Sequence, residues 1–140
     1  MLSTPEADAI SSLLSLMDAI RSDVQAELPD SCSFMHVKAL DFVERTSQPS
    51  MRDIAGSLKI TSPGATMVVD KLVENGELDR HADSDDRRIV RLGITAKGKK
   101  TLASGMKIVT RKIGSRVSAL TKAEQKQLAA LLSKLIKYNQ

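Results

Sequence analysis

The residues best suited to chemistry in this chain are two consecutive arginines, Arg87 and Arg88, which follow the acidic run 83–86. A guanidinium beside a tight turn suits insertion into the minor groove of DNA, where the potential is strongly negative. Asp86 lies two residues before Arg88, so its carboxylate could orient that guanidinium by a bidentate pair. The alternative is an ordinary surface ion pair, which contributes little to stability. The spacing therefore indicates either contact with a polyanion or a solvated charge pair.

Two short helices are predicted directly before these arginines. The first begins at Ser50, with Asp53 three residues later as its capping partner, and its apolar residues at helical spacing are Met51, Ile54, Ala55 and Leu58. The second opens with a polar cap at Thr61 or Ser62, has Pro63 near its first position, and ends at Asn75-Gly76. The pattern predicts a helix, a tight turn and a second helix.

The second helix has a buried face and an outward face that could read DNA. Its core stripe is Ala65, Val68, Val69 and Leu72. On the outward face, Ser62 and Thr66 could bond phosphates or base edges, and Met67 could pack on a thymine methyl. Lys71 could neutralise a phosphate. The alternative is a merely solvated helix face.

A hairpin is predicted after the second helix, with strands over 77–82 and 87–94 and a turn at 83–86. Alternation places Val90, Leu92 and Ile94 on the packed side, with Ile89 and Arg91 on the other. This order of elements, a helix, a turn, a second helix and a basic hairpin, is typical of proteins that bind duplex DNA. The candidate DNA-binding residues are therefore Ser50, Ser62, Pro63, Thr66, Met67, Lys71, Arg80, Asp86, Arg87 and Arg88.

Three further helices are predicted at the two ends of the chain. One starts at Thr4-Pro5 and stops at Pro29, one is capped by Thr95, and the last opens with the capping box Thr121 to Glu124. Their apolar stripes predict dimerisation, with the alternative that they pack within one monomer. Gly105 and Gly114 in the long helix could permit close approach or bending. The candidate dimerisation residues are Ile10, Leu13, Met17, Val117, Leu128, Leu131 and Leu135.

An ordered set of motifs resembles the MarR (multiple antibiotic resistance regulator) family of winged-helix repressors. The matching segments are 33–40, Asp53-Ile54-Ala55, 72–76, Arg80, 83–88 and 94–98. The resemblance implies a mainly α fold with a small β-wing, in one domain over 1–140. The winged helix-turn-helix region would span 33–98, and the dimerisation helices 4–28 and 96–138. One departure is Met67, because the family often has Arg after the Thr of the recognition helix.

The resemblance also implies a function. We expect a DNA-binding transcriptional regulator, a homodimeric repressor that binds a pseudo-palindromic operator and is released by a small anionic or aromatic effector. Phe34, Phe42 and Tyr138 are the only aromatic residues, so the sequence gives little support to an aromatic-lined pocket. Two alternatives remain: a ligand-independent DNA-binding or architectural protein, and a winged helix used for protein contacts.

The charge distribution agrees with a polyanion partner. The net charge is +4, but residues 1–30 hold one basic and six acidic side chains, whereas residues 81–117 hold ten basic and three acidic ones. Clustered Lys and Arg gain affinity for DNA by releasing condensed counterions. A merely solvated basic face is the alternative for Lys107, Arg111, Lys112 and Arg116.

The sequence favours neither an enzyme nor a metal protein. Two histidines and one cysteine show no ligand spacing, and no glycine-rich phosphate loop occurs, so we expect no cofactor and no metal. His36 is interpreted as a helix cap rather than a ligand, and Cys32 as a small buried hydrophobe rather than a redox sensor. No apolar run is long enough for a bilayer and no leader is apparent, so we expect a cytoplasmic protein without membrane contact.

Overall fold

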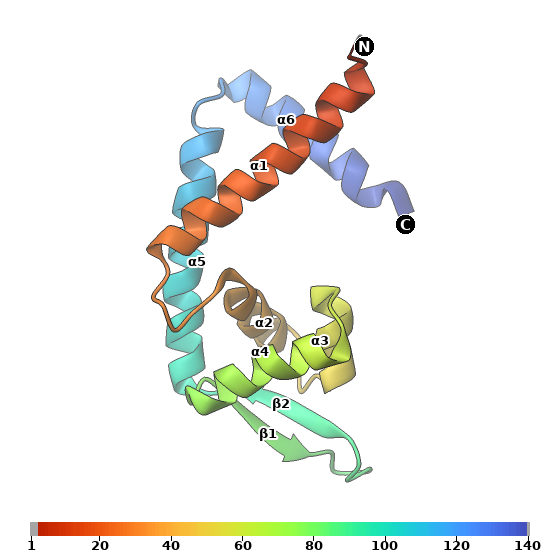
Figure 1. Cartoon of the computed structure of the whole chain (residues 1–140), viewed down its shortest axis with the longest axis vertical. Helices are drawn as coiled ribbons and strands as arrows, with labels where there is room; N and C mark the ends of the chain where they lie inside the picture. The colour runs from red at the N-terminus through yellow and green to blue at the C-terminus, as the bar shows by residue number, and fades with distance from the viewer. Residues whose placement is uncertain (1–2, 140) are drawn as a thin grey trace.

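The computed structural model describes residues 3–139, which form a mainly helical chain with one two-stranded sheet (Figure 1). This agrees with the predicted fold class. The elements in chain order are α1 (Pro5–Glu27), α2 (Phe34–Arg45), α3 (Met51–Leu58), α4 (Ser62–Glu74), β1 (Leu78–Ala82), β2 (Val90–Ile94), α5 (Ala96–Val117), α6 (Lys122–Ile136) and the 3-10 turn η1 (Lys137–Asn139). We call β1, β2 and the loop 83–89 between them the wing.

Hydroxyl side chains set the starts of the helices, as the sequence predicts. Ser50 and Asp53 form a reciprocal capping box at α3, and Thr121 forms one with Glu124 at α6. At α2 the box uses histidine: the Ser33 backbone N–H donates to His36 Nδ1 over 2.9 Å. The interpretation of His36 as a cap is confirmed.

The core lies between α2, α3, α4, the sheet and the first half of α5 (Figure 1). Helix α5 crosses α2 closely, because Gly105 has no side chain: a Cβ there would lie 2.7 Å from Val37 Cγ2. The close approach expected at a glycine of the long helix is confirmed at Gly105, whereas nothing lies within 4 Å at Gly114. The largest fully buried side chains are Leu40, Ile54, Leu72, Leu78, Leu92, Val24, Val37, Val69 and Pro49.

The second strand begins at Val90, three residues later than predicted, and Val90 is exposed rather than packed. The Asp83 backbone N–H donates to the Ile89 carbonyl over 2.9 Å, and the Ile89 N–H donates to the Asp86 carbonyl over 3.0 Å. These bonds close a longer loop than the sequence suggested. The two arginines at 87 and 88 therefore lie at the tip of the wing and not in a strand.

The helices at the two ends of the chain leave much apolar surface uncovered. The end of α1 packs on the body through Val24 and Leu28, but its first half exposes large apolar side chains. Helix α6 buries none of the residues 122–136. The alternative that these stripes pack within one monomer is wrong for both segments. Across the helices of residues 3–139, none has the length and apolar character needed to cross a membrane. The exposed apolar side chains of α1 and α6 are Ile10, Leu13, Leu14, Leu16, Met17, Leu131, Leu132, Leu135 and Ile136.

Candidate nucleic-acid interface

Helix α4 follows α3 through a tight turn that fixes their relative orientation. Lys59 caps α3 in the left-handed region at φ 54°, and its N–H donates to the end of that helix. Two residues later, the Thr61 hydroxyl accepts from the Gly64 N–H over 3.2 Å and starts α4. Thr61, and not Ser62, is therefore the cap, and the Ser62 side chain is left free on the first turn.

The N-terminal half of α4 presents a small, uncharged surface. Its core side is Ala65, Val69 and Leu72, while Met67 is 75% exposed and Ser62, Pro63 and Thr66 are exposed beside it. The Thr66 hydroxyl donates to the Ser62 carbonyl over 3.0 Å, so its oxygen remains able to accept a bond from a base edge. Lys71 follows one turn later and is exposed. The structure brings these predicted residues together on one helix face.

Asp83 organises the wing, a role that the sequence did not reveal. Its carboxylate accepts from the backbone N–H groups of Asp85 and Asp86, over 3.1 and 3.0 Å, and from Arg91 Nε over 2.8 Å. The bond from Arg91, followed by the two backbone bonds, lowers the pKa of Asp83. An aspartate that bonds the N–H groups two and three residues on is a recognisable turn signal, so Asp83 could have been found.

Arg88 projects from the tip of the wing and is oriented by Asp86, as the spacing predicts. Arg88 Nε and Nη2 donate to the two oxygens of Asp86, each over 3.0 Å, and the Arg88 backbone N–H adds a third bond of 3.1 Å. These bonds lower the pKa of Asp86 and raise that of Arg88. The Arg88 side chain is nevertheless 90% exposed. A fixed but solvent-facing guanidinium can meet a phosphate or a groove with little further ordering.

Other candidate residues hold the wing in place. Arg80 of β1 forms an ion pair with Asp70 on the outward side of α4. Ser50 caps α3 and forms a β-bridge with Arg91, and the Leu92 N–H donates to the Pro49 carbonyl over 2.9 Å. These contacts fix the wing against α3 and α4. Ser50 and Arg80 therefore have structural partners in addition to any contact with DNA.

Much of the positive charge of α5 is neutralised inside the chain. Arg111 and Lys112 both pair with Glu27 of α1, the latter over 2.6 Å, and Arg116 pairs with Asp23 over 2.6 Å. The Lys112 bond, opposed by partial burial and reinforced by Arg111, lowers the pKa of Glu27. Three of the four cations for which the sequence left a merely solvated face open are therefore paired within the chain, although the Arg111 side chain stays 61% exposed. The basic side chains that remain candidates for contact with a polyanion therefore lie at the wing and the start of α5.

Neither the cysteine nor the histidines form a metal centre. Cys32 is 6% exposed in the core, and burial followed by the nearby Glu77 charge raises the pKa of its thiol. This burial agrees with its interpretation as a small hydrophobe. In the part of the chain described, residues 3–139, no three His, Cys, Asp or Glu side chains gather where they could hold a metal ion.

The chain is similar to bacterial transcriptional regulators. A family model described as the MarR family matches residues 33–89. The HTH-type transcriptional regulator BilQ of Clostridium symbiosum (strain WAL-14163) is 32% identical over 86 residues, and the match spans 61% of this chain and only 60% of BilQ. The uncharacterized HTH-type transcriptional regulator YpoP of Bacillus subtilis (strain 168) is 30% identical over 118 residues, which are 84% of each chain.

Solved structures share the fold over nearly the whole chain. The S. aureus MepR-DNA complex aligns over 90% of this chain and 95% of that chain at 22% identity, with a TM-score of 0.77. The PcaV transcriptional regulator from Streptomyces coelicolor, in complex with its natural ligand, aligns over 100% of both chains at 17% identity, with a TM-score of 0.79. At such identities the likeness establishes a common fold.

Proposed function

Since the chain belongs to the MarR family of transcriptional regulators, we propose that it binds double-stranded DNA as a homodimer, with α4 in the major groove and the wing in the minor groove. The observation that carries this proposal is the pairing of two exposed features. One is the uncharged N-terminal face of α4, and the other is the Asp86-oriented Arg88 at the tip of the wing. Both lie at the same end of the molecule (Figure 1).

The two features would make different kinds of contact with DNA. Side chains such as Thr66 and Met67 on α4 can meet base edges and thymine methyl groups, which carry sequence information. Arg87 and Arg88 can meet phosphates or the narrow minor groove, which supplies affinity and register. The ion pair between Arg80 of β1 and Asp70 of α4 links the wing to α4. MepR, a protein of the same fold, has been solved in complex with DNA, which supports DNA binding by this chain.

Dimerisation is proposed from the uncovered apolar faces of α1 and α6. Monomeric proteins rarely leave large contiguous apolar patches in water, and these helices expose nine large apolar side chains at the end of the molecule opposite the wing (Figure 1). A second copy of the chain would cover them through a two-fold interface. The two α4 helices could then read two half-sites about one helical turn apart, so the operator would be pseudo-palindromic.

We propose further that the protein is a repressor whose DNA affinity is lowered by a small effector. An effector that binds the DNA-incompetent spacing of the two α4 helices more tightly would shift the population away from the operator. The PcaV transcriptional regulator in complex with its natural ligand supports binding of a small ligand within this fold. If DNA binding proves insensitive to every metabolite screened, the alternative of a ligand-independent architectural protein is favoured instead.

Selection of bound fragments from the source genome tests the proposal directly. We expect recovery of a small set of fragments sharing a pseudo-palindrome, next to the regulated genes. Arg88→Ala should weaken binding to such a fragment by about 1–3 kcal/mol, whereas Lys126→Ala, which removes one exposed charge from α6, should not. Binding that is weak and independent of sequence would favour the alternative in which the winged helix contacts proteins.

A further inference from the structure

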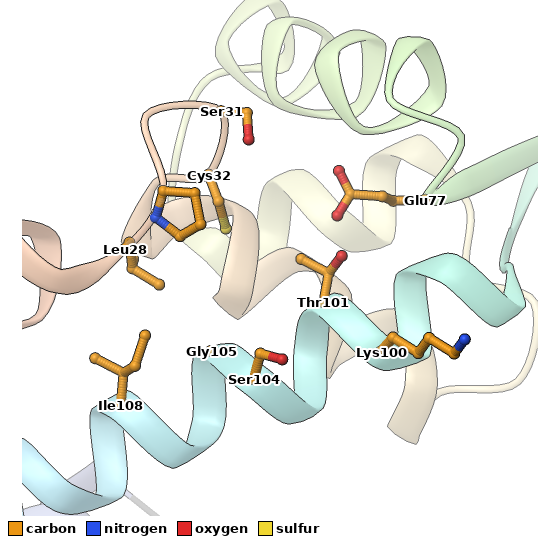
Figure 2. Close-up of a pocket in the computed structure, with 10 residues that line it drawn as sticks. Leu28, Ser31, Cys32, Glu77, Lys100, Thr101, Ser104, Gly105 and Ile108 are labelled. Carbon is orange, nitrogen blue, oxygen red and sulfur yellow. The ribbon is translucent and has the colours of Figure 1, made fainter.

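A small cavity lies between the α1–α2 connection and α5, away from the proposed DNA-contacting residues (Figure 2). Its volume is about 260 Å³, just under the ~300–1,000 Å³ typical of drug-sized ligand sites. Leu28 and Ile108 supply apolar walls at one end, and Ser31, Thr101 and Ser104 supply hydroxyls. The cavity would therefore admit a small ligand with one apolar and one polar end.

Glu77 contributes a carboxylate to the wall of this cavity. The residue is only 5% exposed, and it is the one buried charged side chain among residues 3–139. Within the same residues, no side chain or backbone group donates a hydrogen bond to its carboxylate, and no Lys, Arg or His forms an ion pair with it. Since no fully buried side-chain oxygen or nitrogen in that part of the chain lacks a partner, the carboxylate oxygens themselves reach the space of the cavity. In Figure 2 the carboxylate points into the space beside Cys32, whereas the ammonium of Lys100 points away from it. A carboxylate that faces a cavity without a protein partner can pair with a cation or accept a hydrogen bond from a bound molecule.

The backbone of Glu77 is held in place by neighbours on both sides. Its N–H donates to the Leu72 carbonyl over 2.8 Å, and its carbonyl accepts from the Thr95 N–H over 3.1 Å. Gly98 packs so closely that a Cβ there would overlap the Glu77 carbonyl oxygen. Gly76, at φ 73°, supplies the left-handed turn that leads into this position. The fold therefore holds the carboxylate at the cavity.

Two titratable side chains, Cys32 and His36, lie near the Glu77 carboxylate. The negative charge contributes to the raised pKa of the Cys32 thiol, after burial itself. It also opposes the lowering of the His36 pKa that burial causes. Neither neighbour neutralises it: His36 Nδ1 accepts from Ser33, and the Cys32 thiol lies nearest the Ser33 carbonyl. The end of the cavity at Glu77 is therefore negative, whereas Lys100 lines the cavity with its ammonium directed away from that carboxylate.

We propose that this cavity binds a small organic cation, an ammonium on an apolar stem, whose charged end pairs with Glu77. Because no third metal-ligating side chain accompanies Glu77 within residues 3–139, an organic cation fits the cavity better than a metal ion. Glu77 connects the end of α4 to the start of β1, and the opposite wall is α5. Occupancy would shift both DNA-reading elements against α5 and so alter DNA affinity. This last step rests on the proposed function, whereas binding of the cation does not.

Binding of benzylammonium, compared with benzoate and benzyl alcohol, tests the site without DNA. The three probes share size and ring but differ in charge. Calorimetry or ligand-observed NMR on the full chain should detect benzylammonium and neither of the others. Glu77→Gln keeps the shape and removes the charge, so it should weaken binding at least roughly tenfold, as expected for loss of a charge-assisted pair. Ser104→Phe, which fills the cavity from the exposed side of α5, should abolish binding.

The Lys100→Ala variant tests whether Glu77 pairs with a bound ligand cation or with the ammonium of Lys100. If Lys100 turns inward in solution and pairs with Glu77, benzylammonium will bind the Lys100→Ala variant only, and the proposal is overturned. Equal binding to benzoate, or binding unaffected by Glu77→Gln in a variant whose helical circular dichroism is unchanged, also overturns it. Where benzylammonium binds but alters no operator affinity, the coupling fails and the site stands. Where it binds and the chain binds no DNA, the proposed function fails and the site stands.

Discussion

Leu131→Glu should dissociate the protein into monomers, because Leu131 lies in the apolar face proposed to join two copies. Leu131 and Leu135, one turn apart on α6, are 61% and 63% exposed in the single chain. Fully burying a leucine side chain contributes about 1.5–3 kcal/mol, so covering the exposed part of one of them contributes roughly 1–2 kcal/mol. A two-fold dimer contains each residue twice, which gives about 2–4 kcal/mol for one position.

That magnitude corresponds to a rise in the dimer dissociation constant on the order of 30- to 1,000-fold. The introduced carboxylate adds a further cost, because it would be desolvated in an apolar interface. Sedimentation velocity over a concentration series measures the change. Ser133→Glu is the matched control, since Ser133 is exposed on the opposite side of α6, two residues from both leucines. A wild-type monomer at micromolar concentration, or equal effects of the two variants, would refute the interface.

Gly105→Ala should destabilise the fold by roughly 1–2 kcal/mol net, since its Cβ would lie 2.7 Å from Val37 Cγ2. Gly114→Ala should instead stabilise the fold by about 0.5–1 kcal/mol, because nothing lies within 4 Å of its Cβ. Urea unfolding measures both, and equal effects would contradict the close crossing of α2 and α5. Met67→Arg should strengthen nonspecific DNA binding and steepen the log–log salt slope by about 2 for a dimer, because each half-site gains a phosphate contact; an unchanged slope would place this residue outside the interface. At pH 8, Cys32 of the folded protein should react with a thiol reagent more slowly than Cys32 of the protein unfolded in urea. The reason is that the raised pKa of the buried thiol leaves less thiolate. Its rate should climb as pH rises past 9, and Glu77→Gln should shift that rise to lower pH.

The sequence predicted those features that depend on residues close together in the chain. Helix starts followed from Ser50, Thr61 and Thr121, because a hydroxyl cap acts within three residues. The pairing of Asp86 with Arg88 followed for the same reason, since only one residue separates them. The fold class needed the whole ordered set of motifs, and the observed order of elements agrees with it.

The errors and omissions arose where distant residues or loop bonds decide the structure. The pairs of α5 with Glu27 and Asp23 join residues more than 80 positions apart, so a charge count along the chain could not show that these cations have carboxylate partners. The strand 87–94 was placed too early, because bonds of the Asp83 side chain and backbone extend the loop to 89. Glu77 resembled an ordinary strand residue, and its burial depends on neighbours distant in the sequence, such as Gly98, which packs against its carbonyl.

Hydroxyl-radical footprinting of the wild-type protein on a genome-selected fragment tests the central claim most directly. We predict two symmetric sets of protected positions with centres about one helical turn, roughly 10 base pairs, apart. Protection of the sugars along the minor groove should flank each set, and it should vanish in Arg88→Ala, while the backbone protection within each set persists at higher protein concentration. A single unpaired set of protections, or a wild-type footprint indistinguishable from that of Arg88→Ala, would contradict a dimer that reads DNA with α4 and the wing.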